Sequence, residues 1–198
     1  MKVAKRSYRL ARRRETADCT REAILTEAVR AFGAEPFDRV LLRTIAVRSG
    51  VTEQTVLRLY ESKESLFVAA VAATRERIVA RREEAVPLGD VAAAVKRLAA
   101  VYEEWGDATL LLLSQEARVP IVSRVVDEGR AYHHGWVKRV FAAHVARRRG
   151  ARRALVVAQL AAATDVAVWK VLRRDFGLGP RATAVALASS ALSIAEHG

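Results

Sequence analysis

The chain has 198 residues, 52% of them hydrophobic and 6% aromatic, which allows one or two domains with a buried core and excludes disorder of the whole chain. With 10 Gly and 4 Pro it has too few turn residues for an all-β domain, whereas its many Ala, Leu and Arg residues favour helix. Lys and Arg outnumber Asp and Glu by 34 to 22, a net charge of +12 that indicates nucleic acid, an anionic membrane surface or a general arginine-rich composition.

The cysteine count and the apolar runs restrict the cellular setting. Cys19 is the only cysteine, so an intramolecular disulfide and a thiolate metal cluster are both excluded. Residues 1–14 are basic and lack the apolar region of a signal peptide. The longest apolar stretch, 154–169, is short for a membrane span and is interrupted by Gln159 and Asp165. We therefore expect a cytoplasmic protein without a membrane partner.

The first half of the chain is expected to hold an arm and four helices. Residues 1–14 carry a run of basic residues and no acidic one, so we expect a mobile arm over residues 1–19. From Thr20, apolar residues recur at three- and four-residue spacing until Gly33 and Pro36 end the helix. The next helices are expected at about 42–48, 53–59 and 63 to the low eighties.

The second half also has a helical pattern. Pro87 and Gly89 break the chain, and Asp90 is placed to cap the helix that follows. No segment alternates apolar and polar residues as a half-buried strand would, so the predicted fold is all-α. The expected helices are 90–105, 108–117, 120–147, 152–176 and 181–196.

Residues 42–61, LRTIAVRSGVTEQTVLRLYE, have the pattern of a helix-turn-helix. Ala46 is small enough for two helices to cross closely, Gly50 tolerates the positive φ of the turn, and Thr52 is placed to cap the second helix. Ile45, Val51 and Val56 supply the apolar contact between the helices. An ordinary helical hairpin is the alternative, but it rarely needs this spacing, so the pattern in a basic chain favours DNA binding.

A family resemblance follows from these residues. Residues 20–71 resemble the N-terminal domain of TetR-family repressors through AILTEAVRAFGAEPFD, IAVRSGVTEQTVLRLY and SKESLF, and WGDATLLLLSQEARVP and AATDVAVWKVLRRDFGLG are more loosely similar. The resemblance implies a three-helix DNA-binding domain at 20–66. It also implies a helical effector-binding and dimerisation domain at 67–198. A homodimer would bind palindromic operator DNA and be released from it by a small molecule.

The resemblance also assigns roles in DNA binding. It implies that Thr55 and Lys63 contact phosphates, that Gln54 faces base edges and that Arg43 reaches the backbone or a base. The full expected set is Arg43, Thr52, Gln54, Thr55, Arg58, Tyr60 and Lys63. The arm residues Arg12, Arg13 and Arg14 enter the minor groove or lie along phosphates in one interpretation, and form a solvated tail in the other.

Three residues depart from the family pattern. Leu57 replaces a common aromatic residue, Leu59 replaces a common His, and Glu53 stands where many members have Lys. We expect Leu59 in the core, whereas Leu57 could pack there or touch a thymine methyl group. These departures motivate the alternative of a helical ligand-binding or interaction protein whose DNA-binding surface has degenerated.

The second domain is expected to supply an effector pocket and a dimer interface. The pocket candidates are Tyr102, Trp105, Tyr132, His133, Trp136, Asp165 and Trp169, although each aromatic residue could simply fill the core. Asp165 could recognise a cationic or hydrogen-bonding ligand, or pair with an arginine at the dimer interface, and we favour the pair. Small apolar faces predict a four-helix interface across the dimer. The interface candidates are Val156, Leu160, Val168, Leu172, Leu187, Ala188, Ala191 and Leu192.

Catalysis is not indicated by any motif. His133 and His134 are adjacent and point to different sides of a helix, so they form a poor metal pair. No HExxH, CxxC or Gly-rich phosphate loop occurs, and no nucleophile lies beside a recognisable base. No expected helix combines a strongly cationic face with bulky aromatics, which argues against a membrane-surface protein. We expect a transcriptional regulator with no enzymatic activity, cofactor or metal.

Overall fold

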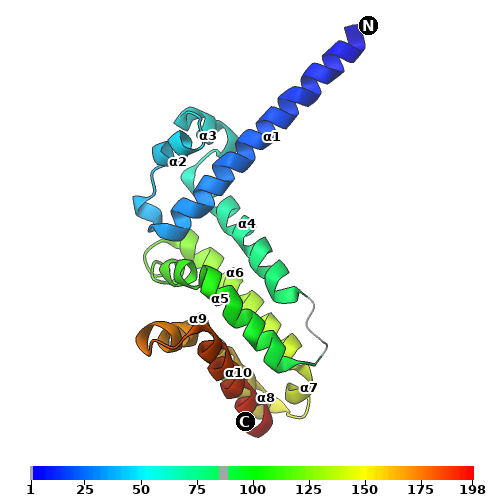
Figure 1. Cartoon of the computed structure of the whole chain (residues 1–198), viewed down its shortest axis with the longest axis vertical. Helices are drawn as coiled ribbons and strands as arrows, with labels where there is room; N and C mark the ends of the chain where they lie inside the picture. Colours follow the sequence, from blue (N-terminus) through cyan, green and yellow to red (C-terminus); the bar gives the residue numbers. More distant parts are fainter. Residues whose placement is uncertain (1, 85–88) are drawn as a thin grey trace. The chain divides into compact units, whose positions relative to one another are not determined.

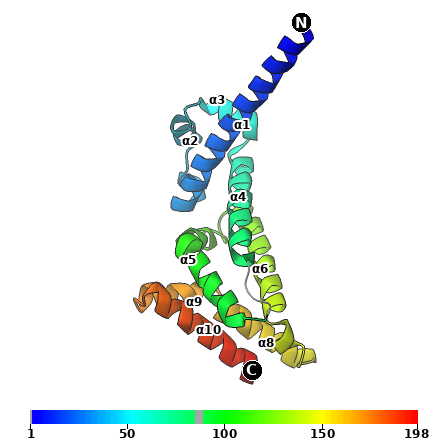
Figure 2. The ribbon, with the colours of Figure 1, turned by 45° about the vertical axis from the view of Figure 1, so that its right-hand side comes forward.

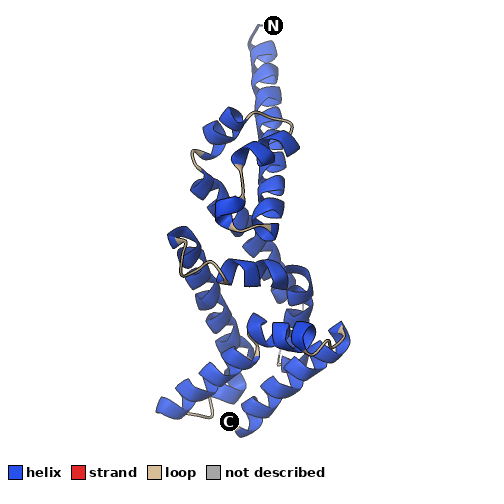
Figure 3. Cartoon of the chain, turned by 90° about the vertical axis from the view of Figure 1, so that its left-hand side faces the viewer, coloured by secondary structure: helices blue, strands red, loops and turns tan. Residues whose placement is uncertain are grey.

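The computed structural model describes the backbone of residues 2–84 and 89–198 and the side chains of residues 15–84 and 89–198. Within these residues every regular element is helical and there is no strand (Figure 3), which confirms the predicted all-α fold. The chain divides into two compact units, Met1–Arg75 and Glu76–Gly198. Each unit is described separately.

The first unit contains α1 (Lys2–Ala34), the short 3-10 helix η1 (Phe37–Arg39), α2 (Leu42–Arg48), α3 (Glu53–Tyr60) and the start of α4 (Lys63–Glu83) (Figure 1). Helix α1 begins at Lys2 instead of near Thr20, because its N-terminal part is rich in Arg, Lys and Ala and contains neither Gly nor Pro. The side chains of Arg12, Arg13 and Arg14 lie outside the described residues, and the mobile arm remains a prediction.

Three aromatic rings form the centre of the first unit. The Phe67 ring of α4 lies 5.1 Å from the Phe32 ring of α1 and 5.3 Å from the Phe37 ring of η1, both in edge-on geometry. Ile24, Ile45 and Leu66 of the same unit are also fully buried. The rings therefore anchor α1 and the start of α4 to each other beneath the helix-turn-helix, a favourable arrangement for aromatic quadrupoles.

The second unit contains the end of α4, α5 (Val91–Leu113), α6 (Pro120–Val140), α7 (Ala142–Val145), α8 (Gly150–Ala163), α9 (Val166–Lys170), the π-helical turn η2 (Val171–Asp175) and α10 (Pro180–His197). Helices α5 and α10 lie side by side (Figure 2). Their buried faces meet those of α6, α8 and α9 in one core. Its fully buried members include Val95, Leu98, Phe141, Leu160, Trp169 and Leu187.

Three expected helix boundaries were wrong. Helix α5 runs through Gly106 and Asp107, because Gly106 is buried in the helix and lies against the Trp169 ring rather than in a turn. The expected helix 120–147 is divided at Phe141, a fully buried residue that lies between the end of α6 and the start of α7. The expected helix 152–176 is divided after Ala163, where the Asp165 carboxylate accepts a hydrogen bond from the Ala167 N–H at 2.8 Å and caps α9.

The segment Gly150–Asp175 is long and apolar enough to cross a membrane when judged by length and composition. A third of its apolar window is buried inside the protein (33%), and the core helix of a water-soluble protein passes the same criterion. The described part of the chain has one such segment, which is weak support for a membrane span.

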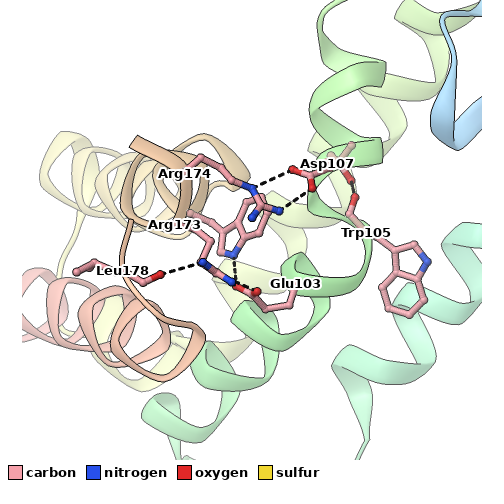
Figure 4. Close-up of polar contacts among 8 residues, drawn as sticks. Glu103, Trp105, Asp107, Arg173, Arg174 and Leu178 are labelled. Carbon is pink, nitrogen blue, oxygen red and sulfur yellow. Dashed lines mark hydrogen bonds and ion pairs between the residues drawn. The ribbon is translucent and has the colours of Figure 1, made fainter. Parts of the chain in front are cut away.

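Polar contacts attach α9 and η2 to α5 (Figure 4). The Trp169 indole N–H donates to the Glu103 carboxylate at 2.8 Å, and Arg173 donates to the same carboxylate at 3.0 Å and to the Leu178 carbonyl at 3.1 Å. Arg174 pairs with Asp107 at 2.6 Å. Glu103 and Asp107 are one helical turn apart on α5, so they hold two successive arginines of η2.

Candidate functional site

Helices α2 and α3 form the predicted helix-turn-helix. Gly50 has φ +67°, a conformation that favours glycine, and the Val51 N–H donates to the Ala46 carbonyl at 3.0 Å to close the turn. Ile45, Ala46 and Val56 retain at most 2% exposure, as their placement between the two helices predicts. The Thr52 hydroxyl accepts from the Thr55 N–H at 3.2 Å and caps α3.

Within the first unit, the outer side of α3 is left uncovered by the chain's own side chains and can contact another molecule. Gln54 and Arg58 are exposed and make no hydrogen bond or ion pair among the described residues. Thr55 is half-buried, with its hydroxyl 3.0 Å from that of Thr52. Leu57 is 40% exposed and lies on the outer side, whereas Leu59 is half-buried. The face thus combines an amide, a guanidinium and an apolar side chain, groups that can read base edges.

Tyr60 and Lys63 have contacts inside the first unit. The Tyr60 hydroxyl donates to the Arg21 carbonyl at 3.0 Å, and burial raises the pKa of Tyr60. The Lys63 ammonium lies 4.6 Å from the centre of the Phe37 ring. Both residues join the recognition region to α1 or η1, and their contact with DNA remains a prediction.

Helix α2 offers a further outward face. Arg43 is exposed, as are Thr44 and Arg48, and Val47 is 72% exposed. Sequence reasoning named only Arg43 of these four. The sequence contained a signal for the other three, because Ile45 and Ala46 were expected to face the second helix. In so short a helix, burial of these two residues leaves the remaining positions facing outward.

The expected effector residues do not form one pocket. Trp169 is fully buried in the core, and the Tyr102 hydroxyl donates to the Thr164 carbonyl at 2.9 Å. Trp105 is half-buried and points away from the Glu103–Arg173 contacts (Figure 4). Asp165 caps α9 and makes no arginine pair within the described part of its own chain, and the pair expected at the interface remains a prediction.

The other three candidates surround an arginine. Arg82, in the last turn of α4, is 8% exposed and donates from Nη2 to Nδ1 of His133 at 3.0 Å. Its guanidinium lies 4.7 Å from the Trp136 ring and 5.1 Å from the Tyr132 ring. Helix α6 thus presents Tyr132, His133 and Trp136 to one buried cation.

His133 is held neutral in this cluster. Burial, the Arg82 charge and weaker contributions lower the pKa of His133 to about 4. Because Nδ1 accepts from Arg82, the ring proton lies on Nε2, which faces the Ala161 carbonyl at 3.3 Å and the Thr164 hydroxyl at 3.2 Å. His133 thus connects α4 to α8.

Sequence reasoning missed Arg82. It lies in the charged segment RERIVARREE, which has the composition of a solvated surface. Its position gave the signal, because Arg82 follows Ile78 by four residues and Val79 by three, on the apolar side of α4.

An open groove of about 1010 Å³ lies along α6 and α8. Small apolar residues line it, among them Ala154, Val157, Ala158 and Ala161, together with Lys138 and Arg153. Of the expected effector residues, His133 and Asp165 line this groove. The groove therefore reaches the histidine that contacts Arg82.

The expected dimer residues mostly lie in the core of their own chain. Val156, Leu160, Leu187, Ala188 and Ala191 are buried against α5 and neighbouring helices, so they have almost no surface for a second subunit. Val168, Leu172 and Leu192 are half-buried. The sequence pattern identified the apolar side of α8 and α10 that packs inward. On the outer sides, Leu155 is 56% and Val185 is 54% exposed.

Comparison with known proteins identifies the first unit. Residues 24–70 match the family described as bacterial regulatory proteins, tetR family. No curated protein is significantly similar in sequence to the whole chain.

Three solved structures share the fold. A transcriptional regulator from Rhodococcus sp. Rha1 has 16% identity and a TM-score of 0.70, covering 88% of this chain and 95% of that one. A proposed transcriptional regulator from Pseudomonas aeruginosa PAO1 has 15% identity and a TM-score of 0.67, covering 89% and 90%. A proposed TetR-family regulator from Mesorhizobium loti MAFF303099 has 19% identity and a TM-score of 0.60, covering 90% and 96%.

Proposed function

We propose that the chain, whose residues 24–70 match the tetR family of bacterial regulatory proteins, is a ligand-responsive repressor that binds palindromic operator DNA as a homodimer in the cytoplasm. The observation that carries this proposal is the outer side of α3. Gln54 and Arg58 are exposed there without an internal partner, in a helix-turn-helix whose buried side is fully packed. Such a helix can enter a major groove and contact base edges.

Selection from random-sequence DNA with the full chain tests this function. The proposal predicts enrichment of an inverted repeat, because two recognition helices related by a two-fold axis read the same half-site on opposite strands. A variant with Gln54→Ala and Thr55→Ala should enrich no sequence. The matched control is Arg124→Ala, an exposed substitution on α6. Enrichment of no sequence by the unmodified chain would overturn the proposal.

Dimerisation is proposed through the outer sides of α8 and α10. Leu155 and Val185 are exposed apolar residues there, and the small Ala151, one turn before Leu155 on α8, allows close approach of another helix. Light scattering at micromolar concentration should give twice the 21.8 kDa mass of one chain. Leu155→Glu should halve that mass, whereas Glu104→Gln, an exposed change on α5, should leave it unchanged. A monomeric mass for the unmodified protein would contradict this part of the proposal.

Release from DNA is proposed to follow a population shift. The ligand-free dimer holds its two recognition helices at the separation that the operator requires. An effector that binds more tightly to a dimer conformation with a different separation lowers the DNA-bound fraction. Helix α4 is the candidate for coupling effector binding to DNA binding, since it begins at Lys63, three residues after α3, and ends at Glu83. Glu83 is next to Arg82, whose guanidinium contacts Tyr132, His133 and Trp136. Titration of the dimer–operator complex with candidate effectors measures this coupling.

The alternative function is a helical ligand-binding protein with a degenerate DNA-binding surface. Exposure of Leu57 at a position where a phosphate contact is common in the family favours it. The DNA selection described above distinguishes the two functions, since this alternative predicts no enriched sequence while small-molecule binding persists.

A further inference from the structure

The guanidinium of Arg82 lacks an anionic partner in the interior of the second unit. It is 8% exposed, and no Asp or Glu pairs with it among the residues that the structure describes. The nearest acidic residues along the chain are engaged elsewhere: Glu83 pairs with Arg139 at 3.1 Å, and Glu84 pairs with Arg81 and Arg97. Residues 1–14 and 85–88 contain neither Asp nor Glu, so they supply no carboxylate either.

The hydrogen-bonding capacity of Arg82 is also largely unused. The guanidinium has five N–H groups, and one described hydrogen bond engages it, from Nη2 to His133. Its Nε is buried and has no hydrogen-bond partner among the residues that the structure describes. The Tyr132 hydroxyl is also buried without a hydrogen bond in the described structure. An unpaired buried donor costs free energy, so this cluster is suited to an acceptor from outside the chain.

We propose that Arg82 is the anchor of the effector site and binds the carboxylate of a small molecule with an aromatic or alkyl body. This inference rests on the proposed ligand-responsive function and names the chemical class of the ligand. The guanidinium edge offers two parallel donors, a geometry that matches both oxygens of one carboxylate. Arg82 lies beside a neutral histidine and near the Glu83–Arg139 ion pair, whose charges cancel, so the cluster balances a single negative charge, which favours a carboxylate over a phosphate dianion.

The surroundings specify the body of the ligand. The Trp136 and Tyr132 rings flank the guanidinium, and His133 lines the groove along α6 and α8. The groove walls near His133 are small and apolar, including Ala158 and Ala161. Arg82 does not itself line the groove, but His133 both lines it and contacts Arg82. The proposal therefore places the carboxylate at Arg82 beside His133 and the apolar body in the groove, an arrangement in which few polar groups orient a mostly apolar ligand.

The position of Arg82 connects this ligand to DNA binding. Arg82 is in the last turn of α4, the helix that follows the recognition helix in the chain. A carboxylate that accepts hydrogen bonds from Arg82 competes with His133 for the guanidinium and weakens the Arg82–His133 hydrogen bond. His133 in turn contacts the C-terminal end of α8 through Ala161 and Thr164. The ligand therefore acts on the attachment of α4 to the rest of the second unit.

Calorimetric titration of the full chain with benzoate, phenylacetate and octanoate, each beside its neutral amide, tests the inference. At least one acid should bind, and its amide should not. Arg82→Met should weaken binding of the acid by about tenfold or more, as for loss of a charged hydrogen bond. Arg82→Lys, which keeps the charge but loses the paired donors, should weaken it less. Arg81→Gln is the matched surface control and should bind as the unmodified chain does.

Three results would overturn the inference: no acid binds, acids and amides bind equally, or Arg82→Met and Arg82→Lys bind as the unmodified chain does. Binding of inorganic phosphate in preference to every acid would overturn the ligand class. The comparison of acid with amide uses the unmodified protein, so it does not depend on the folding of a variant. If the DNA selection yields an operator but no carboxylate binds in the titration, the inference about Arg82 is contradicted while the proposed DNA-binding function stands. Carboxylate binding without any effect on DNA contradicts the ligand-responsive function alone.

Discussion

Gly106 of α5 and Trp169 of α9 approach so closely that a Cβ atom on Gly106 would lie 2.5 Å from Cζ3 of the indole. The indole is fully buried, and its N–H donates to Glu103 on the same helix. The missing side chain at Gly106 thus allows the bulky indole of Trp169 to lie directly against α5.

Gly106→Ala is expected to lower the free energy of unfolding by about 1–3 kcal/mol, because the rigid indole has no free space in which to move. Gly129→Ala, in the exposed part of α6 with nothing within 4 Å of its Cβ position, should instead raise it by about 0.5–1 kcal/mol. Urea denaturation of both variants measures the difference. Equal effects of the two substitutions would contradict the close packing.

The turn of the helix-turn-helix provides a second prediction. Gly50 has φ +67°, so Gly50→Ala should lower the free energy of unfolding by about 1–2 kcal/mol although nothing lies within 4 Å of its Cβ position. Gly50→Asn should cost less, because Asn tolerates this backbone conformation better. Thermal unfolding of the two variants checks the order. If Asn and Ala were equally harmful, the loss would not come from backbone conformation.

His133 should make the stability depend on pH. Its pKa in the folded chain is about 4, against an ordinary value of 6.5, so the unfolded chain binds a proton first as the pH falls. The contribution of neutral His133 to the free energy of unfolding is fully present above pH 6.5. It is lost as the pH falls from 6.5 to about 4, by up to about 3 kcal/mol.

Denaturation between pH 7 and roughly pH 5, above the range in which most carboxylates titrate, isolates this contribution. His133→Gln keeps an acceptor for Arg82 and should remove the slope. His134→Gln, at the exposed neighbouring position, should retain it. A slope that persists in His133→Gln would assign the pH dependence to other groups.

The basic N-terminal segment should contribute to DNA affinity through phosphates. Deletion of residues 2–14 is expected to weaken operator binding and to lower the slope of log affinity against log salt by about 0.9 for each lost phosphate contact. Binding titrations at several salt concentrations measure this slope. An unchanged slope would show that the segment remains solvated in the complex.

Periodicity and turn residues predicted the helix-turn-helix closely, because these signals are local: Gly50, Thr52 and Val56 each have the predicted role. The roles of residues that depend on tertiary packing could not be predicted from the sequence. Gly106 resembled a helix break but is a packing site for Trp169, and Arg82 resembled a surface residue but is buried under two aromatic rings.

The dimer residues illustrate the same limit. The apolar stripes of α8 and α10 were found, but a stripe does not state whether it faces its own chain or a second one. Val156 and Leu160 pack inward, and the exposed Leu155 lies beside them on the next face. For Asp165, the sequence indicated a carboxylate in an apolar run, whereas the break between α8 and α9 explains it as a helix cap.

The most direct test of the central claim is the affinity of the full chain for its selected DNA, measured by fluorescence anisotropy with a scrambled duplex as reference. The account predicts a marked preference for the selected inverted repeat. Gln54→Ala with Thr55→Ala should abolish that preference while the circular dichroism spectrum and thermal midpoint stay close to those of the unmodified chain. Equal affinity for both duplexes, or a preference that survives this double substitution, would contradict the assignment of the outer side of α3 as the DNA-reading surface.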